Sequence, residues 1–72
     1  MVELRFFAAA RAAVGSPTAS VPAGSLSSVL AGFDNPVIAK CTFLVNGIAE
    51  ADLARVLTDG DVVDVLPPFA GG

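Results

Sequence analysis

The order of the hydrophobic patterns along this chain limits its fold more than any other feature. One amphipathic helix pattern covers residues 25–33, where Ser25 suits the N-cap and apolar residues follow at helical spacing: Leu26, Val29, Leu30 and Phe33. Strand patterns occur on both sides of it, at residues 2–7 and 18–21 and then at residues 41–45 and 61–66. One helix between two pairs of strands indicates an α+β domain in which the helix packs across one face of a sheet.

The first strand pattern alternates strictly in polarity. Val2, Leu4 and Phe6 share one face, which predicts a half-buried strand at the start of the chain. Residues 8–14 are rich in alanine and end before Gly15. They predict a short helical turn with a glycine cap, and a loop is the alternative.

Turn signals separate the later elements. Asp34-Asn35-Pro36 ends the central helix, and residues 37–40 are expected to add one further turn. Asn46-Gly47 is a strong hairpin signal, and Asp59-Gly60 leads into the last strand. Between these two turns, residues 51–57 have weak helical spacing, which favours a short helical segment.

Composition narrows the function of the chain. Its 72 residues are enough for one domain with one modest core. Seven acidic residues against four basic ones give a net charge of −3, the wrong sign for holding a nucleic-acid backbone. The chain has no His, Tyr or Trp and only one cysteine, so it lacks the usual general base and the thiolates of a disulfide or zinc site. We therefore expect no metal site, no nucleic-acid partner and little catalysis without another protein.

The start of the chain and its longest apolar runs bear on its location. The first five residues lack the basic start and apolar stretch of a secretory signal. No apolar run approaches the roughly 20 residues that a membrane span needs. The sequence therefore predicts a cytoplasmic protein with no membrane partner.

The last six residues, Pro67-Pro68-Phe69-Ala70-Gly71-Gly72, carry the strongest sign of function. The prolines end strand pairing and favour a stiff exit from the body, and the glycines add chain entropy but nothing to a core. Glycines can enter a narrow channel and bring the terminal carboxylate to the α-phosphate of ATP. The acyl-adenylate that forms is open to a sulfur nucleophile, and Phe69 is a candidate anchor in a partner's pocket. We expect a domain at residues 1–66 and a flexible tail at 67–72, and a chain that merely ends in two glycines is the alternative.

Four segments of the chain follow a known pattern. They are Phe7-Ala8 with Arg11 and Gly15, Phe43-Leu44-Val45-Asn46-Gly47, Asp59-Gly60-Asp61-Val62-Val63, and Leu66-Pro67-Pro68-Phe69-Ala70-Gly71-Gly72. This pattern resembles the small subunit of molybdopterin synthase (MoaD-type), one branch of the ubiquitin-like MoaD/ThiS sulfur carriers. The resemblance implies a β-grasp fold, with a mixed sheet, one main helix across it and an extended Gly-Gly tail.

The resemblance also implies a cycle in which other proteins supply the catalysis. An E1-like adenylyltransferase (MoeB-type) uses ATP to adenylate Gly72, and a sulfurtransferase system converts Gly72 to a thiocarboxylate. The tail then enters the large subunit of the synthase (MoaE-type), where sulfur passes to cyclic pyranopterin monophosphate and builds the dithiolene of molybdopterin. No permanently bound cofactor is implied.

Three apolar residues are candidates for contact with these partners. The register that buries alternate residues of the strands turns Phe7, Leu44 and Leu66 onto the opposite sheet face. We expect an exposed apolar patch there, which would mark a protein interface. Arg11 is a further candidate for steering a partner, with plain solvation as the alternative.

Three other polar residues favour structural roles. Cys41 opens an apolar strand and has no histidine to activate it, so burial is preferred over a role as sulfur acceptor. Asp59 and Asp61 flank a glycine, as a tight turn requires, and no third ligand lies nearby in the sequence.

Two other functions remain open from the sequence. A sulfur carrier of the ThiS type would serve thiamine-thiazole synthesis, and a related carrier would serve a protein-thiocarboxylate route to cysteine. A ubiquitin-like modifier or interaction module belongs to a different class, in which the Gly-Gly end is conjugated to lysine or left unused.

Overall fold

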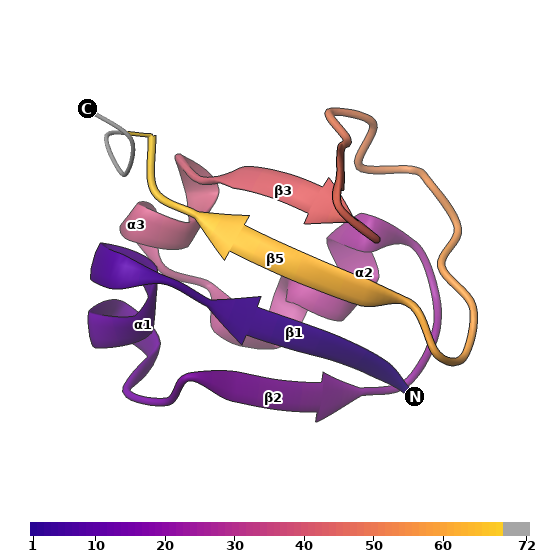
Figure 1. Cartoon of the computed structure of the whole chain (residues 1–72), viewed down its shortest axis with the longest axis horizontal. Coiled ribbons are helices and arrows are strands. Elements are labelled where there is room, and N and C mark those ends of the chain that lie inside the picture. The colour runs from indigo at the N-terminus through magenta and orange to yellow at the C-terminus, as the bar shows by residue number, and fades with distance from the viewer. Residues whose placement is uncertain (69–72) are drawn as a thin grey trace.

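The computed structural model describes residues 1–68 of the chain. Its elements, in chain order, are β1 (Val2–Phe6), α1 (Ala8–Val14), β2 (Thr18–Val21), α2 (Leu26–Leu30), the 3-10 helix η1 (Ala31–Phe33), α3 (Pro36–Ala39), β3 (Thr42–Val45), β4 (Ile48–Ala49) and β5 (Val62–Leu66). The described strands form one sheet in the order β2-β1-β5-β3-β4 (Figure 1). Strands β1 and β5 are parallel and the other neighbours are antiparallel, so the predicted α+β plan with a mixed sheet is confirmed.

One face of the sheet packs against the helices and forms the core. The buried apolar residues of the strands alternate along the chain, as the period-two pattern predicts: Val2, Leu4, Phe6, Val45, Val63 and Val65. Leu26 and Val29 of α2 and Ile38 of α3 belong to the same cluster. The rings of Phe6 and Phe33 lie 5.1 Å apart between centroids, which ties η1 to β1.

Side-chain caps start the two short helices that follow β2. Ser25 Oγ accepts a hydrogen bond from the N–H of Ser28 (3.2 Å), as expected for the N-cap of α2. Asn35 Oδ1 accepts one from the N–H of Val37 (2.8 Å) at the start of α3. The helix predicted at residues 25–33 is confirmed, and its last turn tightens into η1. Within residues 1–68 no helix is long and apolar enough to cross a membrane.

Helix α1 has left-handed backbone conformations at both ends. Gly15 has φ +85°, and its N–H donates to the carbonyl oxygen of Arg11 (2.8 Å), which confirms the predicted glycine cap. Ala8 has φ +50°, a conformation that alanine rarely adopts because its Cβ crowds the backbone. This strain lies directly after Phe7.

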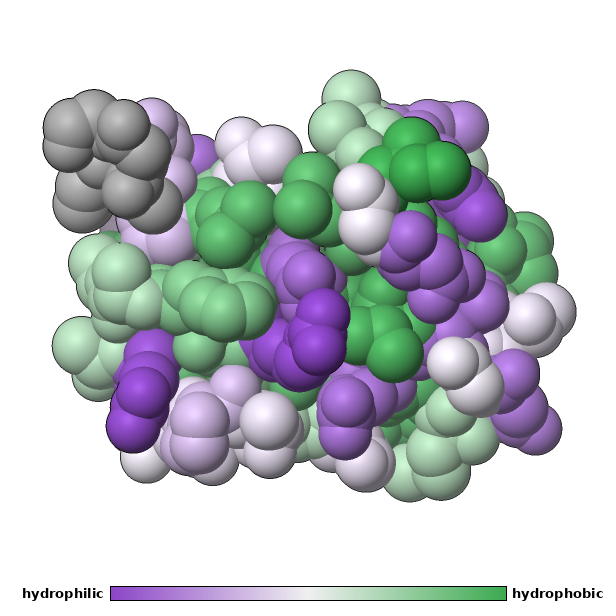
Figure 2. All heavy atoms as spheres, in the orientation of Figure 1, coloured by the Kyte–Doolittle hydropathy of each residue, from purple (hydrophilic) through white to green (hydrophobic). Residues whose placement is uncertain are grey.

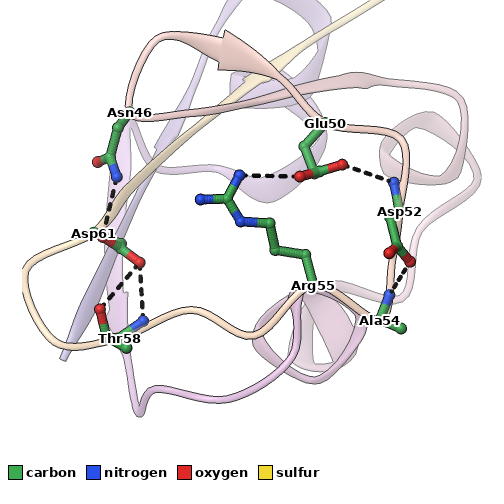
Figure 3. Close-up of polar contacts among 7 residues, drawn as sticks. All are labelled: Asn46, Glu50, Asp52, Ala54, Arg55, Thr58 and Asp61. Carbon is green, nitrogen blue, oxygen red and sulfur yellow. Dashed lines mark hydrogen bonds and ion pairs between the residues drawn. The ribbon is translucent and has the colours of Figure 1, made fainter.

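The helical segment predicted at residues 51–57 is wrong, because these residues form no helix. Glu50 and Asp52 accept hydrogen bonds from the backbone N–H groups of Asp52 (3.2 Å) and Ala54 (2.9 Å), and Arg55 pairs with Glu50 at 3.0 Å (Figure 3). Such local bonds compete with helical ones. The carbonyl of Arg55 also accepts from the first N–H of α2 (2.8 Å), so the segment satisfies that helix end rather than forming a helix itself.

Candidate functional site

The sheet face that points away from α2 and α3 is the candidate site. Strand pairing places Arg5, Asp64 and Leu44 in one row across β1, β5 and β3, on the face opposite the core residues. In Figure 1 the sheet lies in front of α2, so Figure 2 looks onto this helix-free face. Apolar and strongly hydrophilic surface lie side by side over β1 and β5 in that view (Figure 2).

The structure brings Phe7, Leu44 and Leu66 onto this face, as the predicted register requires. Phe7 is 41% exposed and continues the alternation of β1 with an extended backbone. Leu44 and Leu66 are half-buried, which corrects the expectation that both are exposed. Both leucines lie on strands that have a neighbour on each side, which leaves less of a side chain open to solvent than on an edge strand.

Phe7 and Leu66 lie where the chain leaves the sheet, and Leu44 lies opposite Asp64, further back along β5. The N–H of Phe7 donates to the carbonyl oxygen of Val65 (3.1 Å), which places the Phe7 backbone beside the end of β5. Pro67 is buried and Pro68 is exposed, so the described chain leaves the packed body at Pro68. Four of the predicted site residues, Phe69, Ala70, Gly71 and Gly72, lie outside the described residues, and the division between domain and tail stays a prediction.

An ion pair between Arg5 and Asp64 lies on the same face, and the sequence analysis missed both residues as site candidates. Arg5 Nε donates to Asp64 Oδ1, and Arg5 Nη2 donates to Oδ2 at 2.9 Å. This bidentate bond to the carboxylate, together with its charge, raises the pKa of Arg5 above its usual value. Asp64 is only 9% exposed. The alternating pattern within β1 and β5 predicts that Arg5 and Asp64 each lie on this face. It does not predict that the two strands pair, because that contact is long-range.

Arg11 lies on the exposed side of α1, beside a hollow of about 310 Å³ next to the ion pair. Arg5 and Arg11 line this hollow together with Phe7, Pro17 and Thr18. Within residues 1–68, Arg11 forms no ion pair. The structure thus brings the predicted Arg11 close to Phe7 and adds Arg5 to them.

Cys41 has the environment of a structural thiol. It is half-buried, its Sγ donates to the carbonyl oxygen of Val37 (3.2 Å), and burial raises the pKa of the thiol. A raised pKa leaves less thiolate near neutral pH, and the thiolate is the nucleophile. The residue is therefore a poor candidate for carrying sulfur.

Asp59 and Asp61 bind groups in and around their turn. Asp61 accepts from the N–H of Thr58 (2.9 Å) and from Asn46 Nδ2 (3.0 Å), and both bonds lower the pKa of its carboxyl (Figure 3). Asp59 pairs with the N-terminal amine of Met1. The described residues hold no cluster of three or more His, Cys, Asp or Glu that is placed to bind a metal ion.

A mixed sheet with one face wrapped around helices defines a β-grasp, ubiquitin-like domain, as the resemblance implied. The model of the ThiS family matches residues 4–72, so the chain belongs to the ThiS family, the ThiS/MoaD-type ubiquitin-like sulfur carriers. Small carriers of this type are non-catalytic subunits. The helix-free face is thus a candidate for binding rather than for chemistry.

Solved structures with the same fold include two from Haloferax volcanii and one from Helicobacter pylori. The solution structure of the HVO 2177 protein is 30% identical, over 99% of this chain and 85% of that one, with a TM-score of 0.75. The complex of subunits 1 and 2 of the Helicobacter pylori molybdopterin-converting factor contains a chain that is 28% identical, over 99% and 97%, with a TM-score of 0.74. SAMP1 is 23% identical over 99% of this chain and 98% of its own, with a TM-score of 0.78. At this identity the likeness shows the fold alone. No curated protein matches the sequence.

Proposed function

We propose that this sulfur carrier is the small subunit of a molybdopterin synthase, and that it carries sulfur as a thiocarboxylate on Gly72. The observation that carries the proposal is the position of the surface formed by Phe7, Leu44 and Leu66, which adjoins the point where the chain leaves β5. A partner bound to that surface receives the C-terminal residues at its own active centre. The 28% identity to a chain from a complex of the two subunits of a molybdopterin-converting factor supports the same role.

The chemistry of the carrier takes place at one carboxylate. A carboxylate oxygen of Gly72 attacks the α-phosphate of ATP in the E1-like adenylyltransferase, and pyrophosphate leaves. A sulfur nucleophile at the oxidation level of sulfide, delivered by the sulfurtransferase system, then attacks the acyl carbon, and AMP leaves. The resulting thiocarboxylate is the sulfur donor in the large subunit, which holds cyclic pyranopterin monophosphate and supplies the catalytic side chains.

The tail residues Pro68, Phe69, Ala70 and Gly71 have supporting roles in this proposal. The prolines reduce the ordering cost of the tail when it enters a partner, and Phe69 anchors it in an apolar pocket. Glycine at the last two positions lets the backbone lie against a nucleotide without a side-chain clash. Arg11 assists binding of the partner at the edge of the helix-free face.

A reconstituted synthase assay tests the proposal with two altered tails. Removal of Gly72 retracts the carboxylate by roughly 3.5 Å, and a displacement of even about 1 Å costs on the order of a hundredfold in rate. Addition of one alanine after Gly72 replaces the reactive carboxylate of that residue with an amide. Both variants should melt like the wild type and form no molybdopterin. Normal product from either one refutes the proposal, and a sulfur-loaded wild type that forms no molybdopterin points to another acceptor, such as the thiamine or cysteine route.

A further inference from the structure

The ion pair on the helix-free face exposes its guanidinium more than its carboxylate. Asp64 is held within the sheet with a side chain that is 13% exposed, and both of its oxygens bind Arg5. The Arg5 side chain is 48% exposed. Its Nη1 has no hydrogen-bond acceptor among residues 1–68. Asp64 therefore fixes the guanidinium of Arg5 in place, and the Nη1 donor of Arg5 stays free for a partner.

A second arginine lies beside this charge, although the chain as a whole is acidic. Arg5 and Arg11 are two of only four basic residues in a chain with a net charge of −3, and both line the hollow next to Phe7. The other two basic residues lie elsewhere. Lys40 follows α3, and Arg55 pairs with Glu50 in the segment between β4 and β5. Arg5 and Arg11 thus lie together at one edge of the apolar surface, and Glu3 is the acidic neighbour of Arg5 on the same face of β1.

Docking on the apolar surface brings this charge out of water. Row pairing puts Asp64 between Arg5 and Leu44, so a partner that covers Phe7, Leu44 and Leu66 also covers the guanidinium. An Nη1 group that is buried without an acceptor costs binding energy, and an acceptor on the partner restores it. Both oxygens of Asp64 already accept from Arg5, one from Nε and one from Nη2, and neither bonds Nη1. The remaining acceptor has to come from the partner.

We propose that the Arg5–Asp64 pair and Arg11 form an acid-recognition site, which receives a carboxylate from an acidic segment of the synthase large subunit. This inference rests on the proposed function, because that function supplies the partner. Asp64 is a positioning residue in the site, since it holds Arg5 and makes no contact with the partner. The apolar residues beside the site provide the area of the interface, and the arginines select for a partner with negative charge at this edge.

The variants that test the site keep the fold intact. Replacement of Arg5 alone leaves the buried Asp64 without its partner, so the test uses the double variant Arg5→Gln/Asp64→Asn, in which two neutral amides can still bond to each other. Arg11→Glu is the second variant and removes no ion pair within the described residues. Arg55→Gln is the matched control, because Arg55 is also paired with a carboxylate and is similarly exposed at 41%.

Calorimetric titration of each full-length variant with the large subunit from the same organism gives the outcome, at roughly 50 mM and 300 mM salt. We expect the double variant and Arg11→Glu each to lose about tenfold or more in affinity at low salt and to lose most of the salt dependence. Arg55→Gln should bind within about twofold of the wild type. If the double variant binds with wild-type affinity and salt dependence, the inference is wrong and the proposed function stands. If the double variant fails a thermal melt, the same result in Arg11→Glu decides. A wild-type chain that does not bind the large subunit overturns the proposed function and this inference with it.

Discussion

The backbone N–H of Phe7 donates a hydrogen bond to the carbonyl oxygen of Val65 at 3.1 Å. This bond joins the end of the first strand to the end of the last strand, two residues before Pro67. The exposed ring of Phe7 and the point where the chain leaves β5 therefore lie at the same end of these two parallel strands. A partner that holds the ring also sets the position from which the tail starts.

Phe7→Ala should weaken binding of the synthase large subunit by at least about tenfold, because aromatic side chains that become buried at an interface often carry much of its binding energy. Ile48→Ala is the control, since Ile48 is 71% exposed but lies on edge strand β4, away from Phe7. Its affinity should stay within about twofold of the wild type. Equal losses in the two variants would show that general surface hydrophobicity, and not the helix-free face, determines binding.

Ala8→Gly should raise the free energy of unfolding by up to about 1 kcal/mol, because glycine adopts the left-handed conformation without the crowding that alanine suffers. Ala12→Gly is the control within the same helix, where glycine should lower that free energy by about 0.5–1 kcal/mol. Urea denaturation of the two variants measures both effects. A stability loss in Ala8→Gly as large as that in Ala12→Gly contradicts the strain at position 8.

Asp61→Asn should destabilise the protein at neutral pH and have little effect in acid. Hydrogen bonds from Thr58 and Asn46 hold the pKa of Asp61 below its ordinary value of 3.8. A carboxyl group whose pKa is lower in the folded state stabilises the fold above its unfolded pKa, and that contribution is lost as the pH falls through the folded value. The difference in Tm between wild type and variant should therefore shrink as the pH falls below 3.8. A difference that stays constant over this range would contradict the account.

Much of the fold follows from local sequence patterns. Alternating polarity gives the strands, and Ser25 and Gly15 mark helix ends that the structure confirms. The pairing of β1 with β5 brings Arg5 and Asp64 together, although they are 59 positions apart in the sequence. No local pattern encodes such a contact. The helical segment at residues 51–57 failed for a related reason, since its backbone bonds to α2 and its side chains compete with helical bonding.

For the candidate site, the sequence predicted the face on which residues lie but not their surroundings. Alternation placed Phe7, Leu44 and Leu66 on one face, because the side-chain period of a strand decides which face a residue occupies. It did not predict how much of each leucine is covered, since that depends on the strands and side chains beside it. The hollow between Arg5 and Arg11 is lined by residues of β1, α1 and the start of β2, and their arrangement is a property of the tertiary structure.

Mass spectrometry of the intact chain tests directly whether Gly72 carries the sulfur. The protein is incubated with ATP, an E1-like adenylyltransferase and a sulfur source, together with a variant that lacks Gly72 and with Cys41→Ala. We expect sulfur to replace one oxygen at Gly72 in the wild type and in Cys41→Ala, because the half-buried thiol takes no part. The shortened chain should gain no sulfur. A wild-type chain whose mass is unchanged, or a sulfur gain that Cys41→Ala abolishes, would contradict this expectation.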